Sequence, residues 1–125
     1  MTKAEFKKLL DSLADAWGRR DYAAAAEAFA EDVRYADPLR YSFDGRARLR
    51  EFFEADEGYA QRTVWHTVVF DEEQQAGAAE YTYDGTHRYH GTALVRVGGG
   101  EITHWREYQH VDPRGWEEFA SETAF

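Results

Sequence analysis

The chain has 125 residues, of which 43% are hydrophobic and 16% aromatic, and its formal net charge is −9. This length suits one compact domain spanning residues 1–125, with ample apolar material for a core. Because nucleic acids and anionic membrane surfaces are bound mainly through Lys and Arg, we expect an acidic chain without a basic stripe to bind neither. The lack of cysteine excludes disulfides and thiol nucleophiles and suits a reducing cytoplasm, where we expect the protein to reside.

The first residues are expected to form a helix and not a signal peptide. Charged residues interrupt the N-terminal stretch throughout, and no run in the chain reaches membrane-spanning length. One apolar stripe with helical spacing predicts a helix that ends near Gly18: Phe6, Leu9, Leu10, Leu13 and Trp17. Asp21 is a suitable N-cap for a second, alanine-rich helix over residues 22–32.

A short strand is predicted over residues 33–38, where Pro38 ends it. Successive side chains of a strand point to opposite faces, so Val33, Tyr35 and Asp37 are expected to share one face. Residues 39–45 are expected to form a loop that closes with an Asp-Gly turn.

After a third helix, predicted over residues 46–56, the apolar pattern changes to a period of two. Four strands are predicted, over residues 62–70, 76–84, 87–97 and 101–111. Three glycines at 98–100 predict the turn between the last two, and the tail is expected to form a short helix with Trp116 and Phe119. Helices followed by a meander of strands predict an α+β domain, with the three N-terminal helices packed on one face of a curved, mostly antiparallel sheet.

The last predicted strand carries a charged pair between two aromatic residues, in the order Trp105, Arg106, Glu107, Tyr108. Alternation requires one of the two charges to lie on the same face as Trp105. That charge is Glu107, so the sequence predicts an acid on the face of Trp105 and Arg106 on the opposite face.

Three segments, "FAEDVRYADP", "FDGRARLREFF" and "GGGEITHWREYQH", and the order of the elements resemble the cone-shaped nuclear transport factor 2-like superfamily. The resemblance extends from about residue 6 to residue 119 and is strongest to the SnoaL-like and ketosteroid isomerase-like branch. It implies a cone whose interior is lined by one face of the sheet. Because this fold hosts many chemistries and also proteins that are not enzymes, it does not by itself imply an activity.

The resemblance also implies site residues. "VRYADP" is similar to the segment that carries the catalytic aspartate of ketosteroid isomerases, which places Asp37 at the general base. In limonene epoxide hydrolases the same segment holds the attacking water, through positions that match Tyr35 and Asp37. Those hydrolases also have a catalytic Asp in a Trp-Arg-Asp-Tyr segment, and its match here is Glu107, which would face into the cone.

Other parts of these mechanisms do not transfer. The Arg and Asp that complete the epoxide hydrolase triad are replaced by Tyr81 and Tyr83. The oxyanion-hole Tyr and Asp of ketosteroid isomerases fall on Leu13 and, roughly, Ala93. A dehydratase-type inward His falls on Trp65, since His66 lies one residue further along and faces out.

The sequence therefore predicts a catalytic group of Asp37, Glu107 and Tyr35 in an aromatic cavity. Its substrate-binding walls are predicted to be Trp17, Phe53, Tyr59, Trp65, Tyr81, Tyr83, Tyr89 and Trp105. Burial among rings disfavours a charged carboxylate, and two nearby carboxyls can divide the roles of acid and base. The structural alternative is that Asp37 only caps the turn before Pro38, that Glu107 only accepts a hydrogen bond from a tyrosine, and that the rings only fill a core.

The sequence is compatible with two functions. The first is an enzyme without cofactor that isomerises, dehydrates, cyclises or hydrolyses a hydrophobic, cyclic oxygenated compound by proton transfer. The second is a dimeric module of the same fold that binds a ligand or a protein without catalysis. The five histidines show no ordered ligand spacing, so no metal is expected. A homodimer is expected through the outer sheet face, with Val64, His66, Val68, Leu94 and Tyr108.

Overall fold

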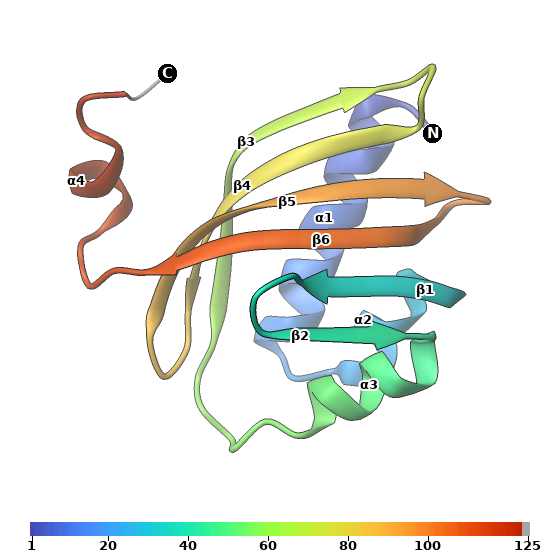
Figure 1. Ribbon diagram of the computed structural model, residues 1–125, viewed down its shortest axis with the longest axis horizontal. Helices are drawn as coiled ribbons and strands as arrows, with labels where there is room; N and C mark the ends of the chain where they lie inside the picture. The colour runs from blue at the N-terminus through green and yellow to red at the C-terminus, as the bar shows by residue number, and fades with distance from the viewer. Residues whose placement is uncertain (124–125) are drawn as a thin grey trace.

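A computed structural model describes residues 1–123 and shows helices packed against one long, curved sheet (Figure 1). The helices are α1 (Lys3–Gly18), α2 (Tyr22–Glu27), α3 (Arg46–Glu54) and α4 (Trp116–Ala120). The strands are β1 (Phe29–Asp37), β2 (Tyr41–Asp44), β3 (Arg62–Asp71), β4 (Ala76–Asp84), β5 (Arg88–Gly98) and β6 (Glu101–Val111). No helix within residues 1–123 is both long and apolar enough to cross a membrane.

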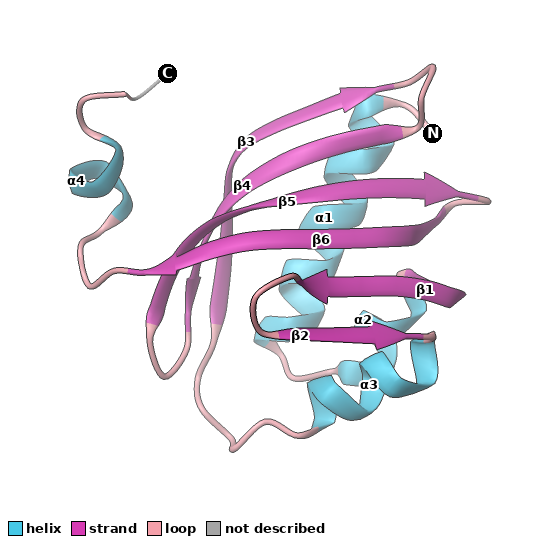
Figure 2. Ribbon diagram, viewed as in Figure 1, coloured by secondary structure: helices cyan, strands magenta, loops and turns pink. Residues whose placement is uncertain are grey.

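The six strands form one sheet in the order β2-β1-β6-β5-β4-β3. All neighbours are antiparallel except β1 and β6, which pair in parallel. Helices α1, α2 and α3 lie on one side of the sheet, whereas α4 lies off its end, beyond the last residues of β6 (Figure 2). The predicted α+β fold, with three N-terminal helices on a curved, mostly antiparallel sheet, is confirmed.

The first helix begins where the sequence offers a cap. Thr2 and Glu5 form a capping box, which satisfies amide groups that the first helical turn leaves free. Four spaced side chains of α1 are then fully buried against the sheet: Phe6, Leu10, Leu13 and Ala16. At α2, the Asp21 side chain accepts a hydrogen bond from the Ala24 amide at 3.1 Å, as expected for an N-cap.

Two boundaries in the first half of the chain differ from the prediction. The second helix ends at Glu27, not at residue 32, and β1 begins at Phe29. Phe29 pairs with Ile102 of β6, and the Ile102 amide donates to the Ala28 carbonyl at 2.8 Å. Strand pairing thus outweighs the helical preference of the alanine-rich run.

The segment predicted as a loop over residues 39–45 contains the strand β2. Its four residues pair with the end of β1, from Asp37 opposite Tyr41 to Arg34 opposite Asp44. The strand is at the edge of the sheet and is only four residues long. This correction matters for function, because β2 carries Tyr41 to the inner face of the sheet.

A β-bulge in β3 overturns one detail of the predicted outer face. Trp65 pairs with Tyr81 and Val68 pairs with Ala79, so two residues of β3 lie opposite one residue of β4. The extra residue reverses the alternation, and Val68 packs on the hydrophobic core. Val68 is therefore not part of the outer face, whereas Val69 is 53% exposed.

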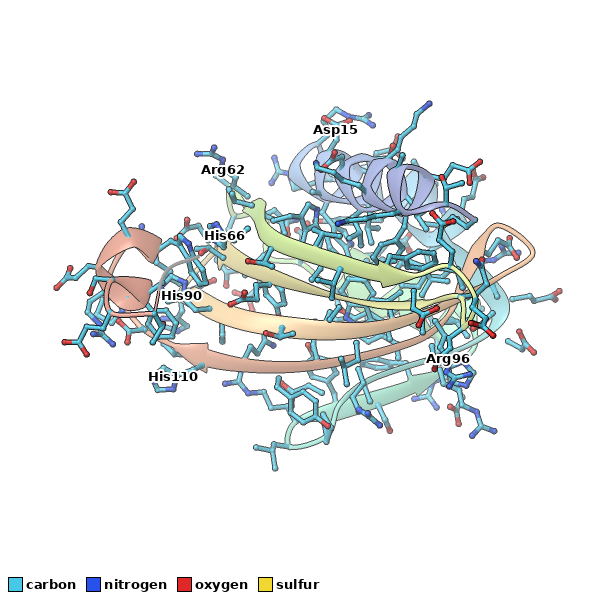
Figure 3. All side chains as sticks on the ribbon, turned by 90° about the horizontal axis from the view of Figure 1, so that it is seen from above. Asp15, Arg62, His66, His90, Arg96 and His110 are labelled. Atoms are coloured by element: carbon cyan, nitrogen blue, oxygen red, sulfur yellow. The ribbon has the colours of Figure 1, made fainter. Side chains whose placement is uncertain are left out.

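The short helix α4 covers one end of the outer face (Figure 3). The His66 ring stacks on Trp116 with centroids 3.8 Å apart, and the His90 ring stacks on Phe119 at 4.2 Å. Thr82 Oγ1 lies between the two histidines, 2.7 Å from His66 Nε2 and 2.9 Å from His90 Nδ1. His66 is thus on the predicted face, but the tail of the same chain covers it.

Candidate functional site

A cavity of about 530 Å³ opens between the inner face of the sheet and the helices. Aromatic residues make up twelve of its 21 lining residues: Trp17, Tyr22, Tyr35, Tyr41, Phe52, Phe53, Tyr59, Trp65, Tyr81, Tyr83, Tyr89 and Trp105. All eight side chains that the sequence predicts as substrate-binding walls are in this lining. Their contact with a ligand stays a prediction.

Glu107 lies in the cavity wall and is 5% exposed. The Trp105 indole donates to its carboxylate at 3.0 Å, and the Tyr35 hydroxyl lies 3.3 Å and 3.4 Å from its two oxygens. The Tyr41 hydroxyl donates to Oε1, and the Tyr81 hydroxyl lies 3.4 Å from Oε2. Neutral donors from four strands therefore surround one acid, and no cationic side chain pairs with it in residues 1–123.

Burial and mutual contact shift the pKa values of Glu107 and of the three tyrosines around it. Burial raises the pKa of Glu107, although hydrogen bonds from Tyr41, Trp105 and Tyr35 oppose the shift. Burial and then the nearby Glu107 carboxylate raise the pKa of Tyr35, of Tyr41 and of Tyr81. The tyrosines therefore remain neutral donors, and Glu107 is the acid of this group whose pKa burial raises.

Asp37 lies on the predicted face of β1, and its side chain is engaged by the turn that follows the strand. It is 4% exposed and shares the inner face with Tyr35, but it is not among the residues that line the cavity. Its Oδ1 accepts from the Leu39 amide at 3.0 Å, which closes the turn after Pro38, and Arg40 lies 3.7 Å from Oδ2. The turn thus holds the Asp37 side chain, and a catalytic role for Asp37 beside Glu107 stays a prediction.

Gln109 connects Asp37 to the cavity tyrosines. Its side-chain carbonyl accepts from the Tyr81 hydroxyl at 2.9 Å, and its amide nitrogen lies 3.4 Å from Asp37 Oδ2 and 3.5 Å from the Tyr41 hydroxyl. Since the shorter contact of Tyr81 is to Gln109, Tyr41 and Trp105 are the closest donors to Glu107. Gln109 thereby fixes the direction of the hydrogen bonds around the acid.

The open end of the cavity carries different chemistry from its closed end. Arg40, Asp56, Tyr59 and His87 are exposed there. The Arg40 guanidinium lies 5.1 Å over the Tyr89 ring. Deeper in, Trp17 has the one buried side-chain nitrogen or oxygen of residues 1–123 that lacks a hydrogen-bond partner, its Nε1.

Sequence reasoning misses two functional candidates. It places Tyr41 in a loop, although the alternation of Tyr41 with Phe43 before the Asp-Gly turn is a signal for a short strand. Gln109 shares the face of Trp105 and Glu107 by alternation, yet its role as a link depends on Asp37 and Tyr81, which are far away in sequence. No group of three or more His, Asp or Glu side chains in residues 1–123 is arranged to hold a metal ion.

Comparison with known families decides where the chain belongs. Residues 10–105 match the model of the SnoaL-like domain. The chain belongs to the SnoaL-like family. The matched region includes Asp37 and the cavity tyrosines but ends at Trp105, two residues before Glu107. Comparison with curated protein sequences gives no significant match.

Several solved structures share the SnoaL-like fold at low sequence identity. An LEH-like epoxide hydrolase of Mycobacterium tuberculosis has 18% identity and a TM-score of 0.74, over 86% of this chain and 84% of that one. A Kribbella flavida protein whose name as a ketosteroid isomerase is provisional has 19% identity and a TM-score of 0.73, over 93% and 87%. A Methylobium petroleophilum protein of unknown function has 18% identity and a TM-score of 0.78, over 100% and 93%. At these identities the likeness shows the fold and not the reaction.

Proposed function

We propose that this SnoaL-like protein is an enzyme that moves a proton on a hydrophobic, cyclic oxygenated small molecule bound in the aromatic cavity. The reaction is an isomerisation, dehydration, cyclisation or hydrolysis and needs no cofactor. One observation carries the proposal. Glu107 is a carboxyl that is 5% exposed, lines an aromatic cavity and is held by neutral donors alone.

The protonation of Glu107 suits this role. A general acid or base works best when its pKa is near the working pH, and burial raises the pKa of Glu107 from the ordinary range of a glutamate. The tyrosines supply the complementary function. Tyr35 and Tyr81 stay protonated, so their hydroxyls can donate to oxygen on the substrate where negative charge develops.

Asp37 is assigned the supporting part of this mechanism. Asp37 is not among the residues of the cavity lining, and its Oδ2 lies 3.4 Å from the amide nitrogen of Gln109. The Gln109 side chain in turn contacts the hydroxyls of Tyr41 and Tyr81. We therefore propose Asp37 as a positioning residue, and Glu107 as the group that exchanges the proton. The epoxide hydrolase and isomerase names of the structural neighbours support the class of chemistry and leave the substrate open.

A binding protein without catalysis is the second candidate. The donors around Glu107 favour it, because a carboxylate that already accepts hydrogen bonds from Tyr41 and Trp105 serves well as a structural acceptor. The two candidates differ in one respect. The enzyme must exchange a proton between Glu107 and the ligand, whereas the binding protein need not.

Replacement of Glu107 by Gln tests the proposal. A thermal-shift screen of steroids, terpenoids and polyketide-like aromatics first supplies a ligand, because bound ligand raises the melting temperature. Turnover, or uptake of deuterium from solvent at a carbon of that ligand, is then measured for both forms. General acid–base catalysis typically contributes about 10²–10⁴-fold, so Glu107→Gln should lower the rate by that order while the ligand still binds.

The matched control is Glu27→Gln, which makes the same change at an exposed residue of α2 outside the cavity lining. It should leave the rate within a few-fold of the original. An unchanged rate in Glu107→Gln would rule out the proton-transfer role. Ligand binding without any exchange in the original protein would establish the binding module in its place.

Two further expectations remain proposals. One is a homodimer formed through the outer sheet face, now without Val68 and with His66 covered by α4. The other is a cytoplasmic location, which suits a chain without cysteine.

A further inference from the structure

The charges around the cavity are unevenly distributed. Glu107 is the one carboxyl in the buried part of the cavity lining. The lining also contains two basic residues, Arg40 and His87, and both are exposed at the open end. Arg40 is also engaged there, over the Tyr89 ring and near Asp37. The depth of the cavity therefore has an acid and no base, which disfavours an anionic ligand and favours a cationic one.

The hydrogen bonds of Glu107 restrict what kind of cation fits. Its oxygens already have Tyr35, Tyr41 and Trp105 as donors, which leaves little accepting capacity for the N–H groups of a ligand. A primary ammonium has three N–H groups and loses their hydration when buried without acceptors. An ammonium that carries alkyl groups in place of those N–H groups avoids this cost.

The walls offer the contact that such an alkylated cation needs. Trp17, Trp65 and Trp105 all line the cavity, together with a majority of aromatic neighbours. The electron-rich faces of Trp and Tyr attract cations, most strongly where water is excluded, and cages of such rings are a known means of recognising quaternary ammonium groups. Rings and acid thus act on the same group without a direct hydrogen bond.

We propose that the cavity binds organic molecules through a tertiary or quaternary alkylammonium group, held between the tryptophan and tyrosine rings near the Glu107 carboxylate. This inference rests on the proposed function, since it names a substrate class for the same site. It adds that the apolar body of the substrate carries a cationic nitrogen.

Binding of the cation also changes the acid. Burial disfavours ionised Glu107 in the empty cavity, and a nearby positive charge favours the ionised form. A quaternary ammonium ligand therefore lowers the pKa of Glu107 and releases a proton where the empty cavity holds one. By linkage, its affinity should rise with pH until Glu107 is ionised in the empty cavity as well.

The test uses two molecules of nearly equal shape, choline and its uncharged counterpart 3,3-dimethyl-1-butanol, with ethanolamine as the primary ammonium. Titration calorimetry on the full chain at neutral pH should show choline binding at least tenfold more tightly than either of the other two. Glu107→Gln keeps the shape of the side chain and should reduce the preference over 3,3-dimethyl-1-butanol to the part that the aromatic rings supply. Glu27→Gln, which makes the same change at an exposed residue of α2 outside the cavity lining, should retain it.

Three results would overturn the inference: equal affinity for choline and the alcohol, a preference for choline that is undiminished in Glu107→Gln, or no binding of choline at millimolar concentration. None of these decides the proposed function. If Glu107 proves essential for proton exchange on an uncharged ligand, the enzyme stands and only the substrate class is wrong.

Discussion

At the scale of single residues, Glu107 is the feature that gives the cavity its chemistry. Alternation along β6 predicts that Glu107 shares the face of Trp105 and that Arg106 lies on the other, the family resemblance implies that the face of Trp105 is the inner one, and both placements are found. Alternation does not show which groups surround it. The Tyr35, Tyr41 and Tyr81 hydroxyls reach Glu107 from three other strands, and only the fold brings them together.

The raised pKa of Glu107 predicts a pH-dependent stability. Between the ordinary pKa of a glutamate and the raised value, the folded protein holds a proton that the unfolded chain has lost. The free energy of unfolding that Glu107 contributes is therefore greatest at pH below 4.5 and falls as pH rises through the folded pKa. Glu107→Gln cannot titrate, so its stability relative to the original protein should increase over this range.

Urea unfolding of both forms at several pH values, from about 4 to about 9, measures the difference between their free energies of unfolding. This range begins near the ordinary pKa of a glutamate and extends well above it. Other titrating groups are common to both forms and cancel in the comparison. A difference that is constant with pH would show that folding does not raise the pKa of Glu107, and a difference that changes in the opposite sense would indicate a carboxylate that the fold keeps ionised. Its role as a proton donor near neutral pH would then be excluded.

At the scale of elements, long strands with regular alternation are predictable from the sequence, whereas a β-bulge and a very short strand are not. The four long strands lie within a residue or two of their predicted bounds, because each is long and alternates clearly. The bulge in β3 has no signature in an alternating sequence, and so alternation assigns Val68 to the wrong face. The four-residue β2 escapes prediction because so short an edge strand depends on β1 for its existence.

Asp37 shows a different limit. Its position before Pro38 fits a catalytic aspartate and a turn cap equally well, since both use the same residue at the end of the same strand. The structure shows the bond to the Leu39 amide, and the contacts with Gln109 and Arg40 join Asp37 to the cavity lining. A motif gives the position of a side chain along a strand but not its partner.

Gly91 of β5 leaves room for the Tyr81 hydroxyl of β4 and the backbone of β6, and a larger residue there is predicted to displace them. A Cβ at Gly91 would lie 2.8 Å from the Tyr81 hydroxyl oxygen and 2.7 Å from the Tyr108 carbonyl oxygen. Gly91→Ala should therefore displace Tyr81 from Gln109 and lower both the melting temperature and ligand affinity. Overpacking of this kind typically costs about 1–3 kcal/mol.

Gly115→Ala is the matched control, because a Cβ there meets no atom within 4 Å and its φ of −65° suits alanine. It should leave the melting temperature nearly unchanged. If Gly91→Ala behaves like Gly115→Ala in both measurements, the sheet yields at this point and Tyr81 is not held by the close approach.

At the scale of the whole molecule, the outer sheet face is divided between a covered and an open part. Helix α4 covers His66 and His90, while Val69, Leu94 and Tyr108 remain 53%, 40% and 50% exposed. We expect the open part to join two copies, because exposed apolar groups on one sheet face favour association. Light scattering at micromolar concentration should give twice the 14.5 kDa mass of one chain.

Leu94→Asp combined with Tyr108→Asp should shift that mass to 14.5 kDa. Leu39→Asp is the control, since Leu39 is 92% exposed in the turn between β1 and β2 and should leave the mass unchanged. A mass of one chain for the unaltered protein would contradict the expected dimer, whatever the variants do.

The parallel pairing of β1 with β6 has a consequence for how the protein folds. Tyr35 and Glu107 are 72 positions apart in the chain, and closing so long a loop is an entropic cost that late contacts must offset. Glu107 is on the last strand of the sheet, later in the sequence than the three tyrosines whose hydroxyls lie near it. Until β6 docks, those hydroxyls have no shared acceptor, and a chain cut before β6 would lack both Trp105 and Glu107. The hydrogen bonds around Glu107 therefore require the complete sheet, and their presence indicates that β6 has docked.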